Sequence, residues 1–197
     1  MTVKKIAALY RRLLTDAGVH ETDPALDLEH TPERVARMLT DELFVGYSEK
    51  AREELDHKFT VFPRPPSEQP PTVVVECGIN FYSMCSHHMV PFFGVAHVGY
   101  VPNKLLVGLS KIPRVVKFLS SKLQLQERLT DEIADYLEEH LKPQGVIVLL
   151  EARHLCMEAR GVRAPGVVTR TTALRGVAWE SAPREEFYRL LQAHNRT

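Results

Sequence analysis

Cysteine and histidine residues with the spacing of metal ligands occur at two places in the chain. Cys85 and His88 are three residues apart, so that a thiolate and an imidazole can reach one ion from a single turn. His154 and Cys156 follow much later, in a run that favours a β-strand, where residues two apart share a face. Thiolate and imidazole ligands suit zinc better than magnesium or calcium. The four residues therefore indicate a zinc-type site.

The spacing alone leaves three other interpretations open. Cysteines and histidines are often ordinary core or surface residues, and short motifs match by chance. All four residues could close a structural zinc site, because structural zinc takes four protein ligands and catalytic zinc typically three and a water. Cys85 could also be a nucleophile paired with a histidine. The zinc deaminase pattern, His-x-Glu followed by Pro-Cys-x-x-Cys, is absent from the sequence.

Composition limits the classes of partner. The 197 residues include 25 basic and 25 acidic side chains, and a net charge of zero argues against a general nucleic-acid binder. The longest apolar runs, such as Val146–Leu150, are far shorter than the roughly 20 residues that span a bilayer. With no secretory signal and an odd number of cysteines, three, we expect a cytoplasmic protein without a disulfide framework.

The first third of the chain is predicted to be helical. Apolar residues recur at helical spacing from Ile6 to Ala17, and a second helix is predicted with Thr31 as N-cap and Pro32 at its first position. A looser polar segment follows, and the prolines after it exclude a regular helix or central strand. We therefore divide the chain into an N-terminal helical segment (1–62), a proline-rich linker (63–71) and a catalytic domain (72–197).

Beyond the linker, β-prone runs alternate with helical patterns. Strands are predicted over 72–76, 92–101, 104–109, 146–155 and 167–174, with Pro102–Asn103 as a turn. Helices are predicted to begin at Ser110, at about Gln126 and at Ser181. The order strand, strand, helix, helix, strand, strand favours an antiparallel sheet with helices on one face, which is an α+β domain.

Four motifs stand in the order and approximate spacing seen in GTP cyclohydrolase I. They are Ser83–His88, Gly108–Ile112, Gln124–Thr130 and His154–Val162. The chain thus resembles this family, from the segment that begins at Thr31 nearly to the C-terminus. The resemblance implies the tunnelling fold (T-fold), in which copies of the chain close into a barrel, and a homo-oligomer, a decamer of two pentamers with active sites between subunits.

The resemblance also implies roles for the clustered cysteines and histidines. Cys85, His88 and Cys156 would hold Zn²⁺ with one position open to water. The activated water would attack C8 of guanine in GTP, formate would leave, and the ribose carbons would rearrange to give 7,8-dihydroneopterin triphosphate. His154 would protonate N7 as attack proceeds, and His87 would assist later proton transfers.

Further residues would bind GTP if the resemblance holds. Glu127, next to Gln126, would accept from N1–H and the exocyclic amine of guanine, a donor pair that adenine lacks. The triphosphate would be held by cations and the ribose or opening ring by a hydroxyl; these residues are Lys111, Arg114, Arg160 and, for the hydroxyl, Ser110. Lys111 follows a helix N-cap, so helix-end N–H groups would also face phosphate.

Some positions depart from the family's pattern. Ser86 stands where Glu is common, which removes a negative charge beside the metal. Arg37 replaces a lysine, and the sequence gives no account of Arg170 and Arg175. Ser86 is the only support for an alternative, a catalytically inactive purine- or pterin-binding T-fold protein with a structural zinc.

Overall fold

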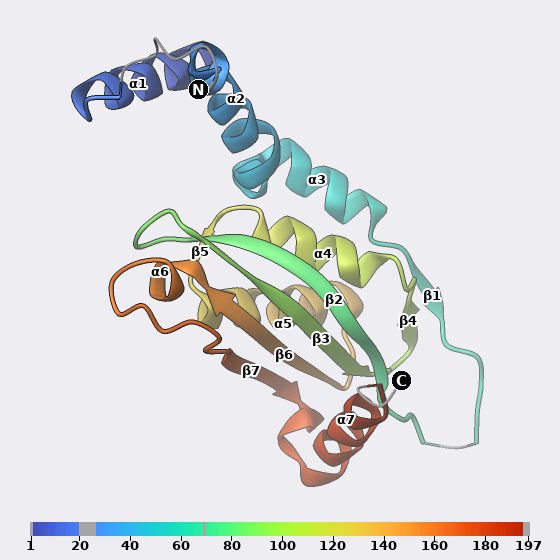
Figure 1. Ribbon diagram of the computed structural model, residues 1–197. Coiled ribbons are helices and arrows are strands. Elements are labelled where there is room, and N and C mark those ends of the chain that lie inside the picture. Colours follow the sequence, from blue (N-terminus) through green and yellow to red (C-terminus); the bar gives the residue numbers. More distant parts are fainter. Residues whose placement is uncertain (1, 20–26, 69, 195–197) are drawn as a thin grey trace.

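The computed structural model describes residues 2–19, 27–68 and 70–194 (Figure 1). It has an N-terminal helical arm and a curved sheet backed by helices, joined by an extended segment. Gln69, within the predicted proline-rich linker, lies outside the described residues. No helix in the described ranges has the length and apolar character that crossing a membrane requires.

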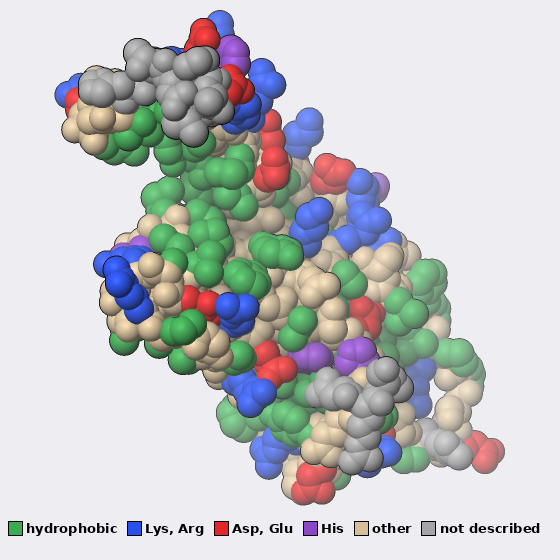
Figure 2. Space-filling model, in the orientation of Figure 1, with side chains coloured by type: hydrophobic (Ala, Val, Ile, Leu, Met, Phe, Trp, Pro, Cys, Tyr) green, Lys and Arg blue, Asp and Glu red, His purple; other side chains and the backbone are tan. Residues whose placement is uncertain are grey.

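The N-terminal arm is helical, as predicted. It contains α1 (Val3–Asp16), η1 (Leu28–His30), α2 (Thr31–Arg37), η2 (Met38–Leu43), η3 (Val45–Tyr47) and α3 (Glu49–Lys58). The prediction that Thr31 caps α2 was wrong, because η1 runs directly into α2 and makes Thr31 its first helical residue. Figure 2 shows hydrophobic side chains gathered where this arm meets the rest of the molecule.

Helix α3 occupies part of the segment predicted to be loose and polar, so that prediction was wrong. Ser48 caps it, with its side-chain oxygen accepting from the Ala51 N–H at 3.3 Å. Leu55 is its only residue classed as buried, so the apolar stripe that would have revealed it is nearly absent. A hydrogen bond from the Tyr136 hydroxyl to the Asp56 carboxylate, at 2.8 Å, ties α3 to the helices of the sheet domain.

The main sheet has five strands in the order β5-β2-β3-β6-β7. These are β2 (Val74–Cys85), β3 (Pro91–Val101), β5 (Leu123–Gln124), β6 (Gly145–His154) and β7 (Thr169–Gly176). All neighbours are antiparallel except β5, which pairs in parallel with the end of β2. β2 runs much further than predicted, because a β-bulge between Glu76 and Ile79 interrupts its alternation without ending it.

A small second sheet joins the arm to the main domain. β4 (Leu105–Val107) pairs with β1 (Val61–Pro63), so the turn at Pro102–Asn103 leads out of the main sheet and does not close a hairpin with β3. The strand before the proline-rich segment is thereby attached to the strand that precedes α4 (Lys111–Ser120).

Two helices cover one face of the main sheet, as predicted. α4 and α5 (Gln126–Leu141) bury their apolar stripes against the inward side chains of β3 and β6, including Val146, Val148 and Leu150. The alternate residues Ile147 and Leu149 face the other side, where α7 (Ser181–His194) packs with Phe187. The α+β class is confirmed, and α7 adds cover on the second face; Ser181 is the first residue of α7.

Candidate metal centre and active site

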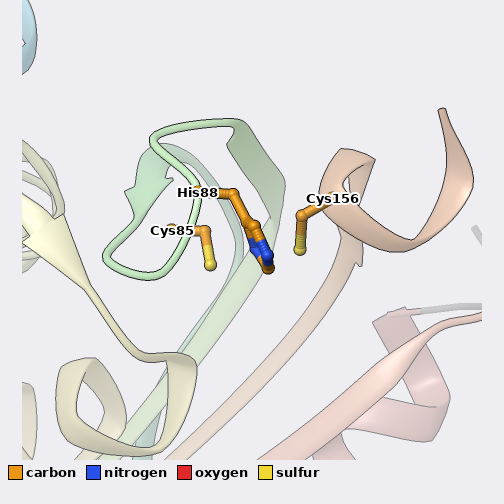
Figure 3. A group of neighbouring side chains, drawn as sticks. All are labelled: Cys85, His88 and Cys156. Atoms are coloured by element: carbon orange, nitrogen blue, oxygen red, sulfur yellow. The ribbon is translucent and has the colours of Figure 1, made fainter. Parts of the chain in front are cut away.

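The side chains of Cys85, His88 and Cys156 converge on one point, although they come from two distant parts of the chain (Figure 3). Their two sulfur atoms and a ring nitrogen all lie within 4.8 Å of one another. Cys85 is buried, Cys156 is half-buried and His88 is exposed. Tetrahedral zinc binds thiolate sulfur at about 2.3 Å and imidazole nitrogen at about 2.0 Å, so three donors at this separation fit such an ion.

A tight turn at the end of β2 brings His88 back beside Cys85. The Met89 N–H donates to the Cys85 carbonyl at 2.9 Å, and the Cys85 N–H donates to the Val90 carbonyl at 3.0 Å. Met89 has a positive φ of 52°, which reverses the chain. The Ser86 N–H donates to the Gln124 carbonyl at 3.0 Å and holds the turn against β5. Local hydrogen bonds therefore set the spacing between the first two candidate ligands, Cys85 and His88.

Cys156 reaches the same point from a helical turn and not from a strand. The predicted strand over 146–155 was wrong at its end: β6 stops at His154, and α6 (Leu155–Glu158) follows. Cys156 and His154 therefore do not share a strand face. Among the described residues, the group consists of Cys85, His88 and Cys156, and neither His154 nor any other histidine, cysteine or carboxylate is a fourth member. This arrangement favours the interpretation with three protein ligands over the four-ligand structural site.

The electrostatics of the metal-free centre oppose ionised sulfur. Burial raises the pKa of the Cys156 thiol, and the neighbouring Cys85 raises it further. A divalent cation reverses this balance, since a coordinating thiol is deprotonated outright. The three donors could therefore hold a divalent cation, whose charge would stabilise both sulfurs as thiolates.

A cavity of about 340 Å³ opens beside the three ligands. Its walls include the side chains that the resemblance assigns to proton transfer and guanine binding: His87, His154, Gln126 and Glu127. Glu127 lies in the first turn of α5 and is exposed, whereas its neighbour Gln126 is buried. Four of the predicted site residues therefore gather around one cavity together with the metal ligands.

The ring of His154 is held on two sides. It stacks parallel on the ring of Phe92, with centroids 4.7 Å apart, and its Nε2 atom lies 2.8 Å from Oε1 of Gln126. The Gln126 amide nitrogen is within hydrogen-bonding distance of the carbonyl oxygens of Leu150 and Thr169, at 3.2 and 3.0 Å. Since these oxygens only accept, Oε1 of Gln126 must be the atom that faces His154, and Nε2 of His154 must carry a proton.

Burial lowers the pKa of His154, and the nearby charge of Glu127 acts in the opposite direction. A neutral ring with its proton on Nε2 leaves Nδ1 as the nitrogen that can exchange a proton. The sequence did not indicate Phe92 or the buried bonds of Gln126. Strand register is what places Phe92 opposite His154.

Three of the four residues predicted to bind the ribose and triphosphate lie away from the metal-side cavity. Ser110, Lys111 and Arg114 are at the start of α4, and none of them lines the metal-side cavity. α4 is ten residues long, so its two ends are about 15 Å apart. Its last residues lead into β5, which pairs with the end of β2 that carries Cys85. Arg114 instead lines a separate cavity of about 410 Å³ with Asp41.

Three other arginines can now be placed. Arg160 is exposed, just after α6, and its charge lowers the pKa of Cys156 against the larger effect of burial. Arg175, unexplained from the sequence, joins β7 to α5 through Asp131 and Asp135, at 2.9 and 2.8 Å. Arg170 pairs with Glu151 on the neighbouring strand β6. Arg170 and Arg175 therefore hold the outer strand of the sheet.

The fold and the site together define a class: an α+β enzyme with a Cys-His-Cys group able to hold a metal ion, beside a cavity lined by histidines and a carboxylate. The chain belongs to the GTP cyclohydrolase I family, whose sequence profile matches residues 6–192. This confirms the resemblance and the T-fold that it implies.

Several relatives are similar over most of their length. The GTP cyclohydrolase 1 of Streptococcus sanguinis (strain SK36) is 43% identical over 192 residues, which is 97% of this chain and 99% of that protein. The GTP cyclohydrolase 1 of Clostridium kluyveri (strain ATCC 8527) is 44% identical over 177 residues, 90% of each chain. That of Clostridium perfringens (strain ATCC 13124) is 50% identical over 149 residues, 76% of each.

Proposed function

We propose that Cys85, His88 and Cys156 hold a zinc ion and that the adjoining cavity is where this chain carries out the reaction of its family. That reaction is the hydrolytic opening of the imidazole ring of GTP, with release of formate and rearrangement to 7,8-dihydroneopterin triphosphate. The observation that carries the proposal is a three-donor group beside a cavity lined by His154 and Glu127. Three protein ligands with one open position are typical of catalytic zinc.

Zinc at this position would lower the pKa of a water in its open position to about 7, so that a nucleophile is available at neutral pH. Residues of the chain itself would then carry out the proton transfers. We assign His154 the relay of a proton to N7 of guanine: its Nδ1 atom, which the contact with Gln126 leaves available, would accept the proton released by the attacking water and pass it to N7. His87, in the exposed turn next to His88, assists the later transfers.

Glu127 supplies the guanine specificity in this proposal. Its carboxylate lies in the cavity wall and can accept from both N1–H and the exocyclic amine. Gln126 was predicted to bind substrate as well, but its side-chain amide is already engaged by the protein. We therefore assign Gln126 an indirect role, in which it orients His154.

The triphosphate is assigned to Lys111, Arg114 and Arg160, and the ribose or opening ring to Ser110. Ser110, Lys111 and Arg114 lie together at the start of α4. These three residues are about 15 Å along α4 from the end that leads toward the metal centre. We therefore infer that they complete the cavity of a neighbouring copy. Such an arrangement requires an oligomer, and we propose the decamer of two pentamers implied by the family. Among the described residues, β7 has no strand on its outer side and β2 only the two-residue β5, which leaves edges for copies to join into a barrel.

Incubation of the purified protein with zinc and GTP under anaerobic conditions tests the proposal. We expect formate in a one-to-one ratio with a product that becomes a fluorescent pterin on oxidation. ATP in place of GTP should give neither. An inactive nucleotide-binding relative, the alternative suggested by Ser86, would instead bind GTP and release no formate. That result would overturn the proposal.

A further inference from the structure

We propose that the ion pair between Arg153 and Glu158 positions the metal site, by fixing α6 so that Cys156 stays against Cys85 and His88. α6 has four residues and begins where β6 leaves the sheet. A helix this short is not stable by itself, so contacts with its surroundings must hold it. The inference rests on the proposed role of Cys156 as a metal ligand.

Arg153 donates two hydrogen bonds to the carboxylate of Glu158. Its Nε atom donates to Oε1 at 2.8 Å, and its Nη2 atom donates to Oε2 at 2.6 Å. Paired bonds of this kind fix geometry as well as adding energy. Arg153 belongs to β6, and its guanidinium lies 5.8 Å from the centre of the Phe93 ring on β3. Arg153 is thus held by the sheet, and its bonds to Glu158 fix the end of α6 relative to β6.

Glu158 also connects α6 to the loop that follows it. Its carboxylate accepts from the Gly166 backbone N–H, and the Ala164 N–H donates to the Met157 carbonyl at 3.0 Å. The side chain of Glu158 is only 8% exposed. Removal of Arg153 would therefore leave the largely covered Glu158 carboxylate with only the Gly166 N–H as its partner, and would release the end of α6 from the sheet. The loop held in this way carries Arg160, the predicted triphosphate ligand.

A second pair offers a matched control. Arg170 on β7 contacts Glu151 on β6, so it too joins an arginine to a carboxylate across the sheet. That arginine side chain is 71% exposed, and the pair lies between two strands with no metal ligand attached to either residue. If any arginine–glutamate pair on this sheet affected zinc equally, both substitutions would have the same consequence.

The experiment compares Arg153→Met, Arg153→Lys, Glu158→Gln and Arg170→Met with the wild type. Zinc affinity is measured by competition with a chromogenic chelator, and the ligand geometry by the sulfur-to-metal absorption band of the Co²⁺-loaded protein. Amide hydrogen exchange over residues 155–166 is followed in the metal-free protein. We expect Arg153→Met and Glu158→Gln to weaken zinc binding by about 10- to 100-fold, to change the cobalt spectrum and to speed exchange.

Arg153→Lys should recover part of the affinity, because lysine keeps the charge but not the paired geometry. Arg170→Met should match the wild type in all three measurements. Wild-type zinc affinity and an unchanged cobalt spectrum in Glu158→Gln and Arg153→Lys would overturn the inference and leave the metal site intact. A wild type that binds no zinc would overturn the proposed function itself, and the inference with it.

Discussion

The Nε2 atom of His154 lies 2.8 Å from the Oε1 atom of Gln126, and this contact decides which nitrogen of the histidine can exchange protons. The amide nitrogen of Gln126 faces two backbone carbonyls, so the orientation of the amide is fixed by the protein.

Gln126→Met should lower kcat while zinc binding persists. The substitution keeps the volume of the side chain but removes the acceptor that holds the proton on Nε2 of His154. A positioned proton-transfer group typically contributes about 10²- to 10⁴-fold, and this substitution reorients His154 without removing it, so we expect a smaller fall in kcat, about 10- to 100-fold. Steady-state rates of formate release and zinc content measure the two properties separately. A normal kcat would show that the tautomer of His154 does not limit the reaction.

Cys156→Ser should lose zinc and activity together. A serine hydroxyl is a poor ligand compared with a thiolate, and the two remaining donors cannot retain the ion at low zinc concentration. We expect ring opening to fall by about 1,000-fold or more. Cys77→Ser is the control, since Cys77 is a free cysteine outside the ligand group. Full turnover of Cys156→Ser without bound metal would contradict the assignment.

Glu127→Gln should weaken the recognition of guanine. Glutamine offers one acceptor and places an N–H group against a guanine donor, so kcat/KM for GTP should fall by about 10- to 100-fold. Glu138→Gln, an exposed residue of the same helix, should leave kcat/KM unchanged. The comparison requires that both variants keep their zinc, which metal analysis verifies. Equal losses in the two variants would indicate a general charge effect.

Co-expression of two inactive chains should restore activity if the sites lie between subunits. Cys156→Ser lacks the metal side of the cavity, and Lys111→Met lacks the proposed phosphate side. In mixed oligomers about a quarter of the sites would combine an intact residue from each chain. We expect turnover in the mixture and none in either variant alone. An inactive mixture with confirmed mixed assembly would place both residues in one chain's site.

Glu76→Gln should stabilise the protein at high pH. Oε1 of Glu76 is buried without a partner among the described residues, and burial raises the pKa of this carboxyl to about 7. The folded chain therefore keeps a proton that the unfolded chain releases above its ordinary pKa of 4.5, so stability falls as the pH rises from there through about 7.

Glutamine mimics the protonated acid at every pH. The variant's advantage in unfolding free energy should therefore be about 1–3 kcal/mol larger near pH 8 than near pH 5. Denaturant unfolding at the two pH values measures this difference. A variant whose advantage is the same at both would show that Glu76 ionises normally in the folded protein.

Local pattern predicted most elements of the catalytic domain. The stripes of α4 and α5 are strongly periodic, and all of Ile112, Val115, Leu129 and Ile133 are buried. α3 and the full length of β2 were missed, because one has almost no apolar stripe and the other contains a bulge. Periodicity detects burial on a regular element, so it fails where an element is weakly buried or irregular.

The sequence by itself determined the chemistry that is available: two thiolates and an imidazole for a cation, histidines for protons and a carboxylate for guanine. The tertiary structure decided how these groups are used. Cys156 lies in a helical turn and not in the predicted strand. The amide oxygen of Gln126 faces His154, and Lys111 lies at the far end of α4 from the metal centre. Side-chain type is a local property, whereas these placements depend on strand register and helix packing between segments far apart in the chain.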